Sequence, residues 1–148
     1  MIKKTLLAFF AGLMMTPAYA SDIDNRALLQ FANNFLHAGA KPPATEADYY
    51  ADSGVAYFEQ GLFSKSEILK DIAAHDARWP VRSFELASGL DVHWLNDLAK
   101  PLVIVNFSVA YELSNGSKHR SGVIPESICL STTSGQIFAV SNRSFFRR

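Results

Sequence analysis

The sequence is poor in cysteine and has no excess of charge of either sign. Cys129 is the only cysteine among 148 residues, so the chain cannot form an internal disulfide. It lies in an apolar run, residues 128–130, where a buried and unreactive thiol is expected. The 14 basic and 14 acidic side chains give a formal net charge of zero. This balance gives no indication of nucleic-acid binding.

Several motifs of catalytic and ligand-binding proteins are also missing. The chain contains no G-x-S-x-G, no P-loop and no G-x-G-x-x-G pattern. A nucleophile-elbow hydrolase or a nucleotide-binding domain therefore has no support. The spacing of the four histidines does not match that of metal ligands, so we expect no metal site and no cofactor. The histidines are His37, His75, His93 and His119.

No apolar run is long enough for an ordinary membrane span of roughly 20 residues. Residues 6–15 instead form a short apolar segment that follows Lys3 and Lys4 and precedes the small-residue site Ala18-Tyr19-Ala20. This pattern predicts a signal peptide over residues 1–20, cleaved after about Ala20, and a periplasmic or secreted protein. An uncleaved anchor is the alternative. Residues 21–148 are expected to form a single domain, with 12 basic and 14 acidic side chains.

The first part of the mature chain has helical patterns. Apolar residues at helical spacing predict a helix from residue 21 to about residue 37. Thr45 is expected to cap a short helix that contains Glu46. Ser64 and Glu67 fit a capping box at the start of a further helix, which Pro80 should end near Trp79. Residues 55–58 and 81–86 read as strands on either side of that helix.

The second part of the chain has strand patterns. Residues 87–95 continue or resume the strand that begins at residue 81, with a bulge at Ser88-Gly89. Apolar and polar residues alternate over residues 101–113, and Asn115-Gly116 predicts a hairpin to residues 119–130. Pro125 interrupts this partner strand and must lie at a bulge or an edge. Residues 136–146 form the last predicted strand, which completes an α+β protein.

The order of features over residues 49–86 resembles the nuclear transport factor 2-like superfamily, which includes SnoaL-like and ketosteroid isomerase-like proteins. These features are a Tyr50-Ala51-Asp52 turn after a helix, a short strand, the capped helix, Trp79-Pro80 and a long strand. The resemblance covers about residues 22–146. It implies N-terminal helices packed on a strongly bent antiparallel sheet, which together enclose a conical cavity. In this superfamily the cavity is the functional site.

The resemblance also suggests where catalytic groups would lie. Ketosteroid isomerase-like members carry a carboxylate general base on the first strand, but here that position falls at about Tyr57. Other members use histidine and aspartate that face the cavity, and His75 and Asp76 are the corresponding candidates. These two adjacent residues point about 100° apart on a helix, so we expect only one to face inward. We assign no catalytic residue and keep Tyr57, His75 and Asp76 as candidates.

Aromatic and amphipathic residues are the candidates for ligand or partner binding, because each offers apolar area with a polar group. Arg78 or Arg82 could stack on the indole of Trp79 or form a forked ion pair with a carboxylate such as Glu126. In the alternative interpretation, Trp79 closes the wide end of the cone and Arg82 forms a structural ion pair. The full candidate set is Tyr50, Tyr57, Trp79, Arg82, Trp94 and Tyr111.

From the sequence we expect a periplasmic, non-catalytic binding or interaction module. Its partner would be an envelope protein, as in a secretion or conjugation apparatus or in toxin inhibition, or a small apolar ligand. A lyase or isomerase that uses the cavity is the first alternative. The second is a homodimer formed through the sheet face that carries Asn106, Ser108 and Glu112.

Overall fold

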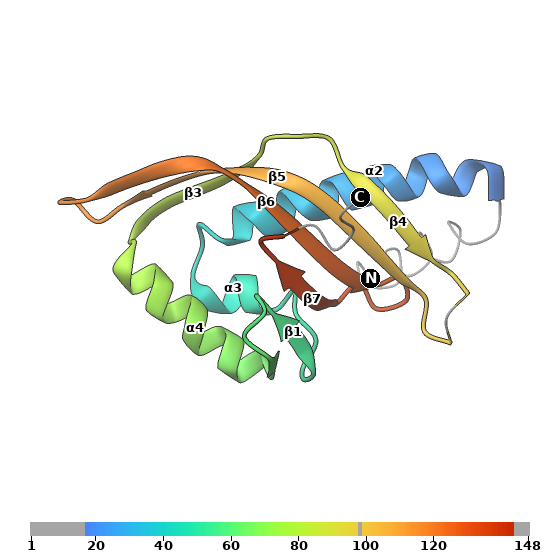
Figure 1. Cartoon of the computed structure of the whole chain (residues 1–148), viewed down its shortest axis with the longest axis horizontal. Helices are drawn as coiled ribbons and strands as arrows, with labels where there is room; N and C mark the ends of the chain where they lie inside the picture. The colour runs from blue at the N-terminus through green and yellow to red at the C-terminus, as the bar shows by residue number, and fades with distance from the viewer. Residues whose placement is uncertain (1–16, 98, 144–148) are drawn as a thin grey trace, which may run out of the picture. The chain divides into compact units, whose positions relative to one another are not determined.

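The computed structural model describes residues 17–97 and 99–143 (Figure 1). By its contacts the chain divides into two units, Met1–Ala32 and Asn33–Arg148. Helix α2 (Pro17–Ala38) begins in the first unit, upstream of the predicted start at residue 21. Most of the predicted signal peptide lies outside the described residues, so its cleavage stays a prediction. None of the helices in the described residues combines the length and the apolar character that a membrane crossing requires.

The larger unit contains the end of α2 and two further helices. Helix α3 (Pro43–Ala47) begins after Pro42, so the predicted cap at Thr45 is wrong. Proline at the first helical position has a suitable φ and needs no amide partner there, which explains the earlier start. Helix α4 (Lys65–Arg78) has the predicted capping box. The Ser64 hydroxyl accepts from the Glu67 amide at 3.3 Å, and the Glu67 carboxylate accepts from the Ser64 amide at 2.7 Å.

In the described part of the chain, seven strands form one mixed sheet in the order β2-β1-β7-β6-β5-β3, and β4 also pairs with β5. The predicted antiparallel sheet has one parallel pair of strands, β1 and β7. Parallel pairing is possible there because the long chain between these strands returns by a crossover. The strands are β1 (Val55–Tyr57), β2 (Leu62–Phe63), β3 (Val81–Leu86), β4 (Asp91–Leu95), β5 (Leu102–Ser114), β6 (His119–Ser131) and β7 (Ile137–Ser141).

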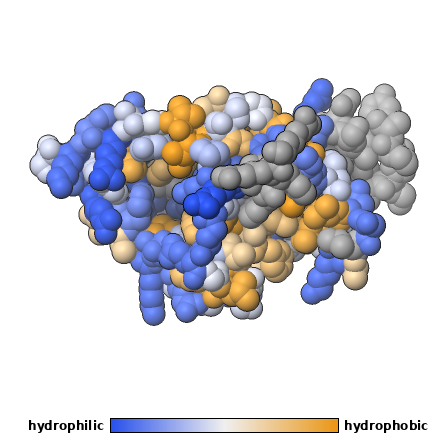
Figure 2. Space-filling view, in the orientation of Figure 1, coloured by the Kyte–Doolittle hydropathy of each residue, from blue (hydrophilic) through white to orange (hydrophobic). Residues whose placement is uncertain are grey.

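Strands β5 and β6 form the long curved hairpin at the centre of this sheet (Figure 1). The predicted alternation of β5 is confirmed, since Val103, Val105 and Val109 are buried. The turn lies where Asn115-Gly116 predicts it. The Asn115 side chain accepts from the amide of Lys118 at 2.8 Å, and Gly116 has a φ of 88°. Side chains at this tip are hydrophilic in Figure 2, as expected for a solvated turn.

Pro125 lies opposite Ser108, in a part of β6 that has only β5 as a neighbour. Both backbone groups of Ser108 are used on the other side of β5, where they bond to Ala87 and to the Ser88 hydroxyl at 2.8 Å. The nitrogen of Pro125 therefore faces the free edge of β6, so the ladder loses no hydrogen bond. The prediction that Pro125 lies at a bulge or an edge is confirmed.

The connection between β3 and β4 interrupts one side of β5, as the sequence predicts at Ser88-Gly89. Leu86 pairs with Val109, and Asp91 pairs with Asn106. The intervening residues do not pair in the strand ladder, but the Ser88 hydroxyl accepts a hydrogen bond from the Ser108 amide of β5. The last strand is shorter than predicted and ends at Ser141. Helices on one side of a large open sheet confirm the α+β class, and the sheet curves toward α3 and α4 (Figure 1).

Candidate functional site

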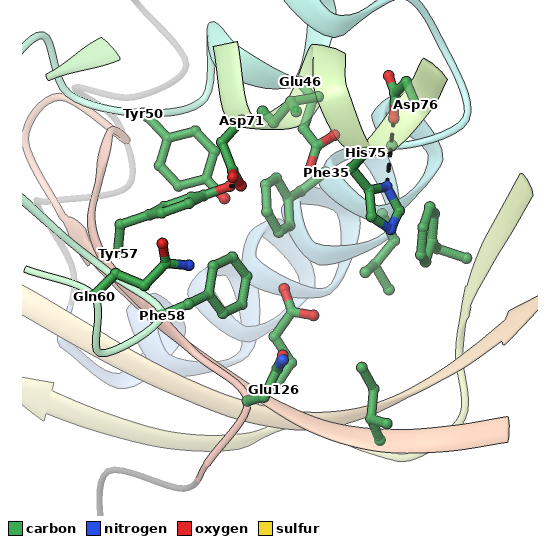
Figure 3. A pocket seen from close by; sticks show the side chains of 16 residues that line it. Phe35, Glu46, Tyr50, Tyr57, Phe58, Gln60, Asp71, His75, Asp76 and Glu126 are labelled. Carbon is green, nitrogen blue, oxygen red and sulfur yellow. Dashed lines mark hydrogen bonds and ion pairs between the residues drawn. The ribbon is translucent and has the colours of Figure 1, made fainter. Parts of the chain in front are cut away.

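A cavity of about 470 Å³ lies in the larger unit, between its helices and the sheet. This volume is in the range that small organic ligands occupy. The end of α2, α3, α4, the β1–β2 turn, β3 and β6 all contribute to its wall (Figure 3). Much of the wall is aromatic, from the rings of Phe35, Tyr50, Tyr57, Phe58 and Phe84.

The polar part of the wall is acidic. Carboxyl groups come from Glu46 on α3, Asp71 and Asp76 on α4, and Glu126 on β6. Among the described residues, the wall includes one imidazole, that of His75, and no lysine or arginine. No group of three or more histidine, cysteine, aspartate or glutamate side chains in this described part is arranged to hold a metal ion. The cavity is therefore suited to exchange protons or to bind cationic groups.

Glu126 and Asp76 are the two buried acids among the described residues of this wall, each with 9% of its surface exposed. Glu126 lies on β6 between Ile124 and Ile128, and its carboxyl group points into the cavity (Figure 3). No hydrogen bond or ion pair to this carboxyl group occurs within the described residues. Burial, and to a smaller extent the charge of Glu46, raises its pKa to about 8. Such a carboxyl group is mostly protonated at neutral pH but can still lose its proton.

Glu46 points into the same cavity from α3 (Figure 3). Burial raises its pKa to about 7. The neighbouring charges of Asp76 and Asp71 act in the same direction, whereas Arg82 opposes them. Glu46 and Glu126 thus form a pair of carboxyl groups from opposite walls, and both can change protonation near neutral pH.

Tyr57 connects β1 to α4 at the mouth of the cavity. Its hydroxyl donates a 2.9 Å hydrogen bond to Oδ2 of Asp71, an exposed residue. Its ring is stacked with Phe63 at 5.1 Å and packs edge-on against Tyr50 at 6.0 Å. Burial, followed by the bond to Asp71, raises the pKa of Tyr57, which keeps the phenol protonated. Both Tyr50 and Tyr57, predicted as binding residues, line the cavity.

His75 and Asp76 both line the cavity, so the expectation that only one of them faces it is wrong. Asp76 falls on the buried stripe of α4 with Ile68 and Ile72. The side chain of His75 is 44% exposed, and its Nδ1 lies 3.7 Å from Oδ1 of Asp76. A cavity wider than one side chain can contact neighbours that point 100° apart.

Arg82 has the structural role given as the alternative interpretation. Its Nη2 atom lies 2.8 Å from Oδ2 of Asp76, and both side chains are more than nine-tenths buried. The guanidinium also donates to the carbonyl oxygens of Gly39 at 2.6 Å and Lys41 at 2.8 Å. These bonds hold the end of α2 against α4 and β3. Arg82 is not among the residues that line the cavity.

The remaining binding candidates also lie outside the cavity wall. Trp79 is buried, and the guanidinium 5.5 Å above its ring belongs to Arg120, whereas the sequence suggested Arg78 or Arg82. Trp94 on β4 and Tyr111 on β5 are half-buried. Any role of these residues in partner binding stays a prediction.

The face proposed for a homodimer is less available than expected. Asn106 is buried, donates to Asp91 at 3.3 Å and accepts a hydrogen bond from Ser127. Only Glu112 of the three predicted face residues is exposed, and Ser108 is half-buried. Dimer formation stays a prediction.

Sequence reasoning did not identify Glu46 or Asp71 as functional candidates. It named Glu126 only as a possible partner of Arg78 or Arg82, whereas Arg82 pairs with Asp76. Glu46 was interpreted only as a favourable charge at a helix start. For Glu126, the available signal is a carboxylate that alternates with Ile124 and Ile128 on one strand face. For Asp71, the signal is its position four residues before His75, on the same side of α4.

No protein-family model matches this sequence, and no curated protein matches it. Solved structures do match. An NTF2-like superfamily protein from Salmonella enterica superposes with a TM-score of 0.68 at 13% identity, over 82% of this chain and 91% of that one. The chain has the nuclear transport factor 2-like fold. The cavity is therefore the interior of the cone that this fold forms.

Two further structures with this fold are informative. One is a proposed polyketide cyclase from Pseudomonas putida KT2440, with a TM-score of 0.50 and 13% identity, over 74% of this chain and 84% of that one. The other is from Catenulispora acidiphila, in complex with S-DNPA. It has a TM-score of 0.55 and 15% identity, over 83% of this chain and 90% of that one. At these identities the likeness concerns the fold alone.

Proposed function

We propose that this protein acts on a small molecule in the cavity by general acid–base catalysis, as a lyase or an isomerase. The observation that carries this proposal is the Glu126 carboxyl group, which is buried in an aromatic cavity without a hydrogen-bond partner in the described residues. Its pKa of about 8 lies close to neutral pH, where a carboxyl group can both give and take a proton.

The rest of the cavity supports the same proposal. Glu46 titrates near pH 7 on the opposite wall and provides a second group for proton exchange. The aromatic side chains can bury an apolar substrate body and exclude water from the carboxyl groups. Structures with the same fold include a proposed polyketide cyclase and a protein in complex with S-DNPA. They support a small-molecule substrate only by analogy of fold.

Ketosteroid isomerase-like proteins carry their carboxylate base at about the strand position of Tyr57. In this chain, Glu126 on a different strand would be the base. In the proposed reaction, the Glu126 carboxylate takes a proton from a carbon next to a carbonyl group, and the electron pair of the C–H bond moves onto the carbonyl oxygen to give an enolate. In an isomerase, the enolate electrons then take the proton back from the carboxyl group at a different carbon. In a lyase, they break the bond to a leaving group, which the carboxyl group protonates. Tyr57 and Asp71 would help orient the substrate at the mouth of the cavity.

Deuterium exchange tests this proposal without knowledge of the product. Small cyclic ketones, with and without an amine substituent, are incubated with the protein in D2O at about pH 8, and NMR follows exchange next to the carbonyl. We expect Glu126→Gln to lower the exchange rate by about 100-fold or more, whereas Glu112→Gln, an exposed change on β5, leaves it unchanged. Equal rates for wild type and Glu126→Gln would contradict the proposal.

The same experiment separates catalysis from the non-catalytic binding role. Ketones that bind the wild-type protein without any exchange would favour binding alone. A periplasmic location and an envelope partner are separate proposals that depend on residues 1–20. Fractionation of cells that express the full chain, with detection of the mature N-terminus by mass spectrometry, tests the location.

A further inference from the structure

Of the carboxyl groups on the helical side of the cavity, only one has a cation in direct contact within the described residues. On the helical side, Arg82 neutralises Asp76 at 2.8 Å. Asp71 receives the hydroxyl of Tyr57, which carries no charge. The Glu46 carboxyl group has no hydrogen bond or ion pair within the described residues. Glu46 and Asp71 are therefore two acidic groups of one wall that have no ion pair in the described residues, although the charge of Arg82 acts on Glu46 from a distance.

A second and independent observation points to a ligand. Glu126 is nine-tenths buried, aimed into the cavity from the sheet, and unpartnered in the described residues. No fully enclosed side-chain oxygen or nitrogen of the described residues lacks a hydrogen-bond partner, so the Glu126 carboxyl oxygens border the open space of the cavity, where a bound molecule can supply hydrogen bonds. The cavity thus presents unpartnered carboxyl groups from both of its walls.

Aromatic rings surround the space next to these acids. Phe35 and Tyr50 meet edge-on at 5.9 Å, and Tyr57 and Phe58 meet edge-on at 4.8 Å. Phe58 keeps this position although its φ is 44°, an uncommon value for a bulky residue. Its amide donates to the carbonyl oxygen of Val140 at 2.9 Å, which holds the turn. Aromatic faces attract cations because their π-electron density is negative, and desolvation strengthens this attraction.

We propose that the cavity selects a small organic cation, an amine with an apolar cyclic body, whose protonated nitrogen lies against Glu46 and the neighbouring aromatic rings. This inference rests on the proposed function and adds the class of substrate. The ammonium group would lie at the helical wall, with Asp71 at the mouth, and the reacting carbon would lie near Glu126 on the sheet side (Figure 3).

Other ligand classes fit this wall less well. An anionic molecule would meet Glu46, Asp71 and Glu126 without any lysine or arginine among the described lining residues. A neutral apolar molecule would remove water from these carboxyl groups and return no hydrogen bond to them. A protonated amine offers both a charge and hydrogen-bond donors, and its apolar body can contact the rings.

Three probes with the same aromatic body isolate the effect of charge. Benzylammonium, benzyl alcohol and benzoate are cationic, neutral and anionic at neutral pH, and only the first combines a positive charge with N–H donors. Their affinities are measured by NMR titration of the full protein. We expect the cation to bind at least about tenfold more tightly than the alcohol, and benzoate to bind most weakly.

Glu46→Gln should remove most of this preference, because it lowers the affinity for the cation and has little effect on the affinity for the alcohol. The matched control Glu112→Gln replaces an exposed glutamate of β5 and should leave all three affinities unchanged. Equal affinities for the cation and the alcohol in the wild-type protein would overturn the inference. So would tighter binding of benzoate, or the absence of binding by the cation.

Glu126→Gln makes failure of this inference distinguishable from failure of the proposed function. This variant should lose deuterium exchange and keep most of the preference for the cation. Deuterium exchange on neutral ketones, without any preference for amines, would contradict the proposed amine substrate and support the acid–base function. Selective binding of the cation without any deuterium exchange would support the preference for amines and contradict the acid–base function.

Discussion

The phenol of Tyr57 on β1 donates a 2.9 Å hydrogen bond to Oδ2 of Asp71 on α4. This contact brings a carboxylate from a helix to the strand position where the ketosteroid isomerase-like pattern would place one. The acidic character of the cavity thus arises from tertiary contacts, since Glu46, Asp71 and Glu126 come from α3, α4 and β6. A substitution at Tyr57 tests the bond directly.

Tyr57→Phe should lower the free energy of unfolding by about 1 kcal/mol, because it removes one hydrogen bond and keeps the buried ring. Asp71 is exposed and can recover its bond from water, so a larger loss is not expected. Urea denaturation measures the change. Tyr111→Phe removes a hydroxyl from a half-buried ring outside the cavity wall, and it should change stability by less than about 0.5 kcal/mol. Equal losses for the two variants would show that the bond to Asp71 does not contribute.

The stability of the protein should depend on pH through Glu126 and Glu46. Their pKa values in the folded protein are about 8 and about 7, against an ordinary value of 4.5. Between these values the folded state retains protons that the unfolded state has released. Their contribution to the free energy of unfolding is therefore complete below about pH 4.5 and is lost as pH rises toward 8. Glu126 faces Glu46, and Glu46 faces Asp71, Asp76 and Arg82, so these groups modulate the transition.

Urea denaturation of wild type and Glu126→Gln at several pH values between about 5 and 8 tests this dependence. Glutamine does not titrate, so the wild-type protein should lose stability relative to the variant as pH rises. The relative loss should be steepest in the middle of this window, at roughly 1 kcal/mol per pH unit, and should become shallower as pH approaches 8. Glu112→Gln should give a profile parallel to that of the wild type. Parallel profiles for Glu126→Gln and wild type would mean that Glu126 is not buried as a protonated acid.

Local signals predicted the elements of this fold well. The capping box of Ser64 and Glu67, the helix end before Pro80 and the hairpin at Asn115-Gly116 are all confirmed. Each is decided by residues close together in sequence, whose backbone chemistry acts locally. Strand β2 was missed because two residues carry no alternation. The parallel pairing of β1 with β7 was missed because no local pattern specifies a partner so far along the chain.

The candidate site was less predictable for the same reason. Tyr50 and Tyr57 were predicted as binding residues because each offers apolar area with a polar group, and both line the cavity. Glu46, Asp71 and Glu126 are far apart in sequence, and each also has an ordinary surface interpretation. Only their convergence around one cavity gives these three residues a shared chemical role, and burial there raises the pKa values of Glu46 and Glu126.

Loss of Arg82 should destabilise the protein strongly. Arg82→Met removes the cation paired with buried Asp76 and leaves two carbonyl oxygens, those of Gly39 and Lys41, without their donor. Breaking a buried ion pair at one partner costs about 3–5 kcal/mol, because the remaining charge is uncompensated. Arg78→Met, at an exposed position of α4, is the matched control and should cost less than about 0.5 kcal/mol.

Adding Asp76→Asn to Arg82→Met should recover part of the lost stability, since the uncompensated charge is then gone. Arg82→Lys should not restore the wild-type value, because an ammonium group cannot reach Asp76 and both carbonyl oxygens in the way that a planar guanidinium does. Thermal unfolding of the four variants measures these differences. A double variant no more stable than Arg82→Met would show that the carbonyl contacts matter more than the ion pair.

Gly39 contributes to the cavity through its lack of a side chain. A Cβ atom at this position would lie 2.9 Å from Cδ2 of Phe84 and 3.1 Å from the carbonyl oxygen of Leu36. Gly39→Ala should therefore push the ring of Phe84 away and cost about 1–3 kcal/mol. Gly89→Ala is a matched control, since a Cβ there meets nothing within 4 Å, and neither glycine has a positive φ.

The same substitution connects packing to ligand binding, because Gly39 and Phe84 both line the cavity. A displaced Phe84 ring changes the space available to an apolar body, so Gly39→Ala should weaken the cationic and the neutral probe by similar factors. Glu46→Gln should weaken only the cation. In a Phe84→Leu background, Gly39→Ala should cost less stability, since the nearest neighbour of the new methyl group has been shortened. If Gly39→Ala lowers stability equally in that background, the new methyl group clashes with the Leu36 carbonyl oxygen and does not displace the Phe84 ring.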